Sequence, residues 1–371
     1  MPTLKGATEF YQEHLNRVSR SFAACIARLE TPLRSWVSLT YLLCRILDTV
    51  EDATWAERRS QFHSFEVFRK LVEHKISPEV ESKELDGWMR SFPATIPEGE
   101  RLLLNDTGRI LHDLHCAPEE IRSPILALVG AMSEGMRHFC ARSNDGRVRL
   151  IGLAEVNQYC FFVAGLVGET LSKLLRAVGS QMELRRDLVV DSHHFGLFLQ
   201  KVNLLKDQVR DEAEGRFLVP SRSELFASLG RNAVGAMRYI EAIPLERKDY
   251  RVFCSWSLFL GLATLPLLSK ADNSKPPHKS AELVDKLPRD LTLDLFAQIE
   301  NWVDSPDILR TQFNYFLSAA GLPVSEHSST MEHSMDVSRS HQPATNWAWI
   351  AEVYKGLLSP DDLCALGLAD C

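Results

Sequence analysis

The spacing of apolar residues constrains the fold of this chain more than any other feature of its sequence. Apolar side chains recur every three or four residues along most of the chain, an interval that places them on one face of an α-helix. Strand-like alternation of apolar and polar residues is scarce. The clearest helical runs are Trp36–Val50, Phe62–Leu71, Ile125–Phe139, Val156–Leu175, Phe195–Val209 and Ala233–Ala242. We therefore predict an all-α protein.

Proline and polar residues separate these runs. Prolines fall mostly between the runs, at Pro78, Pro93, Pro97, Pro118, Pro124 and Pro220. Pro124 directly precedes the run Ile125–Phe139, so we expect it at the start of that helix. The polar stretches Ser269–Pro288 and Ser325–Thr345 indicate loops, and the composition of the second is typical of disorder. We predict one large domain over residues 1–324, a polar segment over 325–345, and a C-terminal segment over 346–371 without a transmembrane helix.

The charge balance and the cysteines limit the class of protein. With 42 Lys and Arg against 49 Asp and Glu, the chain has no basic excess for binding nucleic acid. Its eight cysteines include no CxxC pair, which favours buried free thiols in a reducing compartment. The first residues, MPTLKGATEFYQEHLNR, lack the apolar core of a signal peptide. We therefore expect a cytoplasmic protein.

The stretch Val252–Leu268 is apolar and free of charged residues. It is slightly shorter than the ~20 residues that cross a bilayer, and it contains Ser, Thr, Gly and Pro. We predict a core helix here rather than a membrane span. A peripheral contact with a membrane surface stays open.

A first acidic motif lies in the segment YLLCRILDTVED, which runs from Tyr41 to Asp52. On a helix, Asp48 and Asp52 share a face, and Glu51 lies one turn from Asp48. The flanking residues are mostly apolar, so the carboxylates emerge from a helix that is otherwise suited to burial. Mg²⁺ would offset their repulsion, since it binds carboxylate, water and phosphate oxygens. A solvated helix face explains a lone motif of this kind at least as well.

A second acidic motif lies in the segment Gln200–Phe217, where Asp207 and Asp211 again stand one turn apart. Asn203 continues the same polar stripe, and Lys206 and Arg216 bracket the acids. Basic residues beside a carboxylate pair suit a metal–diphosphate complex, because the acids hold the metal ions and the bases hold phosphate oxygens. A salt-bridged, solvated face would also explain this motif if it stood alone.

Two such motifs far apart in the chain are stronger evidence than either motif alone. If their helices pack antiparallel, the motifs would face each other across a cavity that holds a diphosphate with two or three Mg²⁺ ions. A metal-dependent helical hydrolase is an alternative, but it would carry Glu-x-x-His or His-Asp ligand pairs, and neither motif contains a histidine. A helical scaffold is the non-enzymatic alternative, with both motifs as solvated faces.

Six sequence blocks give the chain a resemblance to a known family. The blocks are SRSF at Ser19–Phe22, YLLCRILDTVED at Tyr41–Asp52, FHSF at Phe62–Phe65, YCFFVAGLVGETLSKL at Tyr159–Leu174, GLFLQKVNLLKDQVRDEAEGRF at Gly196–Phe217, and FC…LATL between Phe253 and Leu265. In these blocks the sequence resembles the squalene/phytoene synthase family, and specifically its squalene synthase branch. The resemblance implies a class I isoprenoid synthase fold with a central channel.

The resemblance also implies an activity. Two farnesyl diphosphate molecules would be joined head to head to form presqualene diphosphate. A second ionisation, a rearrangement and hydride transfer from NADPH would then give squalene. The implied cofactors are Mg²⁺ and NADPH, and we expect the enzyme to be a monomer.

The roles of single residues follow from the same resemblance. Tyr159, Tyr41 and Arg45 would take part in catalysis, with Tyr159 helping to remove the proton that closes the cyclopropane ring. The metal ligands would be Asp48, Glu51, Asp52, Asp207 and Asp211. Diphosphate oxygens would be bound by Ser19, Arg20, Ser21, Arg45, Lys206 and Arg216. The substrate channel would be lined by Phe22, Phe162, Gln200 and Asn203, and NADPH would contact Asn203, Lys275 and Lys279. Ordinary core packing would also explain Phe22 and Phe162.

The sequence departs from the family pattern in three places. Arg210 stands where the family usually has an acid, although the outer pair of aspartates is intact. Ser257 and Leu258 replace a Pro-Gln pair, and the stretch KPPHKSAELVDK is a poor match to the basic segment that the family uses for NADPH. The first half-reaction is therefore better supported than the reductive half. Dehydrosqualene or phytoene synthesis, which needs no NADPH, is the alternative.

Overall fold

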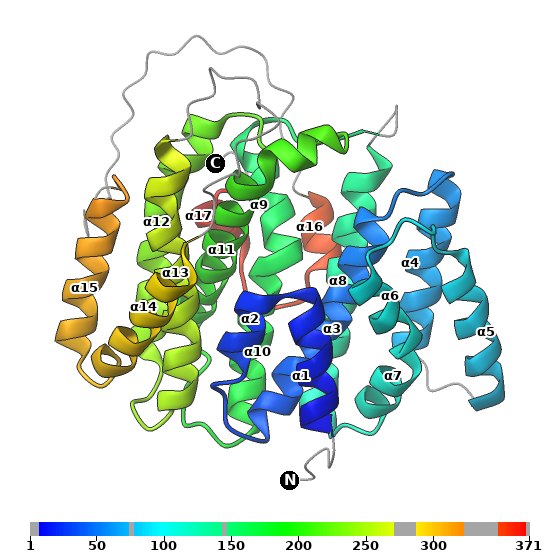
Figure 1. The fold of residues 1–371 in the computed structure, drawn as a ribbon, viewed down its shortest axis with the longest axis horizontal. Coiled ribbons are helices and arrows are strands. Elements are labelled where there is room, and N and C mark those ends of the chain that lie inside the picture. The colour runs from blue at the N-terminus through cyan, green and yellow to red at the C-terminus, as the bar shows by residue number, and fades with distance from the viewer. Residues whose placement is uncertain (1–6, 74–77, 143–146, 271–286, 323–347, 369–371) are drawn as a thin grey trace. The chain divides into compact units, whose positions relative to one another are not determined.

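The structure, a computed structural model, describes residues 7–73, 78–142, 147–270, 287–322 and 348–368 (Figure 1). Within these ranges the regular structure is helical, apart from two paired strands, β1 (Val148–Arg149) and β2 (Arg216–Phe217). The all-α prediction is therefore confirmed. Contacts group the chain into two compact units. Unit 1 is Met1–Val148 with Leu166–Leu184, and unit 2 is Arg149–Gly165 with Arg185–Cys371.

Unit 1 is organised around α3, which contacts α1, α2, α4, α6, α7, α8 and α10. Its helices are α1 (Ala7–Val18), α2 (Arg20–Ile26), α3 (Leu33–Asp52), α4 (Arg58–Glu73), α5 (Pro78–Ser91), α6 (Glu98–Asn105), α7 (Thr107–His115), α8 (Glu119–Ala141) and α10 (Leu166–Ala177). Leu42, Leu43, Ile46 and Leu47 of α3 are fully buried. Burial of each stabilises the fold by about 1.5–3 kcal/mol relative to exposure. The first acidic motif is thus carried by the helix at the centre of unit 1.

Unit 2 is organised around α11 (Arg186–Ala213), which packs against α9, α12, α13 and the π-helix η1. The other elements of unit 2 are α9 (Gly152–Cys160), η1 (Phe161–Gly165), α12 (Arg222–Ala242), α13 (Lys248–Lys270), α14 (Arg289–Trp302), α15 (Pro306–Ala319), α16 (Ala348–Val353) and α17 (Pro360–Ala365). Two glycines let backbones approach closely. A Cβ on Gly196 would lie 2.3 Å from the carbonyl oxygen of Ala164, and one on Gly235 would lie 2.6 Å from His194.

The predicted helical runs are confirmed, with two differences. Helix α8 begins at Glu119, so Pro124 lies inside the helix and not at its start. The helix starts earlier because the extended backbone of Pro118 (φ −54°, ψ 150°) already ends the preceding turn. Pro124 has no N–H to donate to the carbonyl of Glu120, so one hydrogen bond of the helix is missing there. Glu120 lies in the first turns of the helix and is exposed to solvent. In the second difference, the run Val156–Leu175 is interrupted by η1.

The cysteines agree in part with the prediction of buried free thiols. Cys25, Cys44, Cys140, Cys160 and Cys254 are free and buried. Two others differ from the prediction, because Cys116 is exposed and Cys364 is disulfide-bonded. Spacing along the sequence could not show this, since a disulfide depends on which residues the fold brings together.

Helix α13 contains the apolar stretch Val252–Leu268. Among the described residues, Lys248–Ser269 is the one helix whose length and composition would allow it to cross a membrane. However, 72% of its most apolar window is buried inside the protein. This burial agrees with the predicted core helix.

The C-terminal segment packs onto α9, η1 and α11 of unit 2. The ring of Trp349 stacks on that of Phe162, with centroids 4.7 Å apart. Asn157 Nδ2 donates a hydrogen bond to the carbonyl of Gly367 (2.9 Å), and Gln158 Nε2 donates to that of Leu368 (2.7 Å). These contacts make residues 348–368 part of unit 2. Whether residues 1–324 form one domain stays a prediction.

Replacing Gly196 by Ala should destabilise the protein, because the added methyl group would overlap the carbonyl oxygen of Ala164. We expect the free energy of unfolding to fall by about 1–3 kcal/mol, measured by urea unfolding followed by circular dichroism. Gly130→Ala in α8 is the control, since nothing lies within 4 Å of the added Cβ. It should leave stability unchanged or raise it by about 0.5–1 kcal/mol. An equal loss in both variants would contradict the close approach.

The buried His194 should make the fold sensitive to acid. Burial lowers its pKa to about 3, and the charges of Arg238 and Lys201 act in the same direction. Between pH 6.5 and 3 the unfolded chain therefore binds a proton that the folded chain does not. The free energy of unfolding should fall as the pH decreases through this window, by roughly 1.4 kcal/mol per pH unit from this group. Urea unfolding of His194→Gln should show a shallower decline, and identical slopes would refute this assignment.

Candidate functional site

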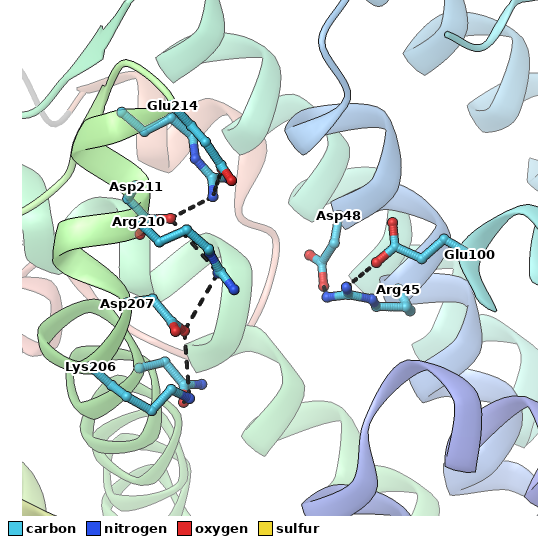
Figure 2. A network of polar contacts seen from close by, with 10 residues as sticks. Arg45, Asp48, Glu100, Lys206, Asp207, Arg210, Asp211 and Glu214 are labelled. Carbon is cyan, nitrogen blue, oxygen red and sulfur yellow. Dashed lines mark hydrogen bonds and ion pairs between the residues drawn. The ribbon is translucent and has the colours of Figure 1, made fainter. Parts of the chain in front are cut away.

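The first acidic motif is paired with a base on its own helix. Arg45 Nη1 lies 3.6 Å from Asp48 Oδ2, and Arg45 Nη2 donates to Glu100 Oε1 of α6 (Figure 2). The Thr49 hydroxyl lies 3.3 Å from the other oxygen of Glu100. Burial opposes the charge on Arg45, but the Asp48 and Glu100 carboxylates outweigh it and raise the pKa of Arg45 above its usual value. Arg45 is thus a permanent cation held beside Asp48.

The acids around Arg45 differ in exposure. The side chain of Glu100 is 13% exposed, whereas that of Asp48 is 35% exposed. Glu100 therefore fixes the guanidinium from the inside, and Asp48 is the acid more exposed to solvent. Asp52 is exposed and Glu51 is half-buried. Glu100 could not be predicted as a partner of Arg45, because it lies 55 residues away in the chain, at an ordinary acidic helix start.

Ser19, Phe22 and Tyr41 lie together in unit 1. The Ser19 side chain is hydrogen-bonded to Tyr41, and the rings of Phe22 and Tyr41 have centroids 5.8 Å apart. Burial raises the pKa of Tyr41 to about 12, although the Ser19 hydrogen bond and the charge of Arg45 act against the rise. Tyr41 is therefore a neutral phenol at physiological pH.

The second acidic motif, on α11, lies among three bases (Figure 2). Asp207 Oδ2 is 3.5 Å from Lys206 Nζ and 3.7 Å from Arg210 Nη2. Arg216 Nη2 donates to Asp211 Oδ1 at 2.5 Å. Arg210, which replaces the usual family acid, therefore contributes a cation to this cluster.

The two aspartates of this motif also differ in exposure. The Asp207 side chain is 28% exposed and that of Asp211 is 6% exposed. Burial raises the pKa of Asp211 to about 6, and the charges of Asp207 and Glu214 add to the effect. Asp211 is thus held inside by Arg216, while Asp207 is the more accessible ligand.

The remaining predicted residues occupy several places. Lys206 Nζ donates to Asn203 Oδ1 (3.2 Å), which joins Asn203 to the second motif. Gln200, one turn earlier on α11, is half-buried. Tyr159 on α9 is 5% exposed, and Phe162 in η1 is fully buried. Ser21 is exposed. The side chain of Arg20, and residues Lys275 and Lys279, lie outside the described part of the structure.

Each motif by itself fits a metal ion that is shared with a phosphate ligand. Among the described residues, no three His, Cys, Asp or Glu side chains converge on a closed metal site. Mg²⁺ usually takes only one or two protein carboxylates and completes its shell with waters and substrate phosphates. Asp48 and Asp207 are accessible carboxylates of this kind. Arg45, Lys206 and Arg216 stand beside the acids as groups that bind phosphate oxygens.

Comparison with known proteins shows the same family in sequence and the same fold in structure. The family model for squalene/phytoene synthase matches residues 15–226. Squalene synthase of Cyberlindnera jadinii is 30% identical over 285 residues, and that of Eremothecium gossypii is 34% identical over 282 residues. These alignments cover 69% and 68% of this chain but only 60% of each relative.

The structural comparisons concern the fold alone. The structure of TcSQS with the ligand E5700 has a TM-score of 0.68 at 21% identity, and covers 85% of this chain and 91% of that one. A dehydrosqualene synthase has a TM-score of 0.51 at 16% identity, covering 81% of this chain and 97% of that one. The predicted all-α isoprenoid synthase fold is confirmed.

Mg²⁺ and inorganic diphosphate together should raise the melting temperature, whereas either ligand alone should not. The reason is that the acids need the metal and the bases need the anion; ligands at 100 times their Kd stabilise by about 2.7 kcal/mol. Asp207→Asn should remove the shift in a thermal-unfolding assay. Asp187→Asn, at the exposed start of the same helix, is the matched control and should keep it. An unchanged shift in Asp207→Asn would support a merely solvated face.

Proposed function

The chain belongs to the squalene/phytoene synthase family, and from this premise we propose that it is a squalene synthase. It would condense two farnesyl diphosphates to presqualene diphosphate and reduce this intermediate to squalene with NADPH. The observation that carries the proposal is the pair of acidic motifs. Each sets an accessible aspartate beside fixed bases, within the region that matches the family.

Loss of diphosphate from the substrate is the first chemical demand. Asp48 and Asp207 would hold Mg²⁺ with help from Glu51, Asp52 and Asp211, and the metal would neutralise the departing diphosphate. Arg45, Lys206 and Arg216 would bind its oxygens. Because Glu100 and Asp211 already orient two of these bases, little side-chain freedom is lost when the anion binds.

Survival of the allylic cation is the second demand. Phe22 and Tyr41 offer adjacent aromatic faces, which stabilise a nearby cation by roughly 0.5–2 kcal/mol. Since the pKa of Tyr41 is raised to about 12, its oxygen stays protonated and is a poor nucleophile toward the cation. Tyr159 would assist removal of the proton during cyclopropane closure. The released diphosphate would be the final acceptor, because an ordinary tyrosine is a weak base near neutral pH.

The reductive half-reaction would use NADPH as hydride donor. Of the residues expected to contact NADPH, Asn203 is the one that lies in the described part of the structure. Phe162 and Gln200 would belong to the substrate channel. The enzyme would act as a monomer in the cytoplasm, with a peripheral membrane contact for product release.

Purified protein should convert farnesyl diphosphate and Mg²⁺ to squalene only when NADPH is present, as identified by gas chromatography with mass spectrometry. Dehydrosqualene with and without NADPH would contradict the proposal. Turnover of the C20 analogue alone would point to phytoene synthesis.

Asp48→Asn and Asp207→Asn should each lower the rate of diphosphate release by about 10³-fold or more, since ionisation depends on the metal. Asp187→Asn should retain full activity, and equal losses in all three variants would argue against the assigned motifs.

A further inference from the structure

Unit 2 contains a cavity of about 210 Å³ that the proposed reaction does not use. Residues of α9, α11 and α12 line it, together with the chain just after α17. Its charged lining residues are Lys201 and Arg231. Neither residue is assigned a role in the proposed reaction.

Lys201 is a buried amine whose hydrogen-bond acceptors are neutral. The residue is 1% exposed, and its Nζ donates to Ser228 Oγ (2.9 Å) and Asn232 Oδ1 (2.7 Å). Both acceptors are fixed by further bonds. Ser228 donates its proton to the carbonyl of Leu225, and the Asn232 amide nitrogen contacts His194 Nδ1. Two of the three ammonium N–H groups are thereby used. For the third, no acceptor is found among the described polar contacts.

The cavity lacks an acid to balance its two cations. No Asp or Glu is among its lining residues, and within the described ranges neither Lys201 nor Arg231 is ion-paired to a carboxylate. Burial lowers the pKa of Lys201 to about 8, and Arg231 adds to the effect, while the Cys160 thiol opposes it. Lys201 is therefore mostly charged at pH 7. A buried charge without a counter-ion is unfavourable by several kcal/mol, and an anion in the cavity would remove this penalty.

The lining indicates the class of anion. Lys201 and Arg231 together carry two positive charges, which a phosphate monoester balances at neutral pH and a single carboxylate does not. Arg231 is exposed and presents a planar guanidinium that suits phosphate oxygens. Leu153, Ala154 and Leu366 supply an apolar wall for a short carbon body.

We propose that this cavity binds a small phosphate monoester, with Lys201 and Arg231 holding its phosphate group and the apolar wall holding its organic part. The site stands independently of the squalene synthase proposal, since it uses none of the residues assigned to that reaction. The cavity also adjoins α9, the helix that carries Tyr159. Asn157 of α9 lines the cavity and donates a hydrogen bond to the carbonyl of Gly367, another lining residue.

Isothermal titration of the full chain with glycerol phosphate, in EDTA to exclude Mg²⁺, tests the proposal. We expect saturable one-site binding, weakened about tenfold or more by Lys201→Met and by Arg231→Gln, because each loses one charge-assisted contact. Ala154→Leu should fill the apolar part and weaken binding without lowering the melting temperature. If Lys201→Met fails to fold, the exposed Arg231→Gln carries the test. Absence of saturable binding at millimolar ligand overturns the proposal.

Two further titrations test whether glycerol phosphate binds in the cavity or at the second acidic motif, and whether the cavity prefers a monoester to free phosphate. Lys206→Met, in the second acidic motif, should leave glycerol phosphate binding intact. Loss of binding in this variant, with normal binding in Lys201→Met and Arg231→Gln, would assign the anion to the acidic motif and overturn the proposal. Inorganic phosphate should bind more weakly than glycerol phosphate, because it leaves the apolar wall empty. The reverse order would assign the cavity to free phosphate and overturn the monoester.

Discussion

The need to balance charge on tightly packed helices governs both acidic motifs. Each motif pairs a nearly buried acid with a base and leaves a second acid accessible. In unit 1 the buried acid is Glu100 and the accessible one is Asp48, with Arg45 between them. In unit 2 Asp211 holds Arg216, and Asp207 is accessible. Carboxylates thus serve two purposes, and burial distinguishes the acid that fixes a base from the acid that is more exposed to solvent.

Close backbone packing in unit 2 has a comparable effect on α9 and η1. Gly196 lets the backbone of α11 lie directly against the carbonyl of Ala164 in the π-helix. The side chains of Asn157 and Gln158 are held by the carbonyls of the C-terminal segment. Tyr159 therefore follows two hydrogen-bonded neighbours in the chain and directly precedes the closely packed segment that leads into the π-helix. Such irregular helices recur at functional sites, where they redirect side chains.

Much of this could be predicted from the sequence, because it depends on local patterns. The apolar period predicted the helices, and the spacing of Asp48 to Asp52 and of Asp207 to Asp211 placed each pair on one helical face. What could not be predicted depends on distant contacts. Glu100 carries no local sign that it holds Arg45. The start of α8 depended on the backbone of Pro118 rather than on the following proline. The neutral acceptors of Lys201, Ser228 and Asn232, come from α12, and periodicity does not specify which polar groups meet it.

The contacts of the C-terminal segment bear on how the protein folds during synthesis. Asn157 and Gln158 find their hydrogen-bond acceptors 210 residues later in the chain. Until those acceptors leave the ribosome, the side chains around Tyr159 lack their final partners, and Phe162 lacks the ring of Trp349. Contacts of such long range form late and slow the approach to the native state. Unit 2 therefore completes its folding only after α16 and α17 have been synthesised, and a nascent chain that is stalled before α16 would leave the apolar surface of η1 uncovered and open to chaperones.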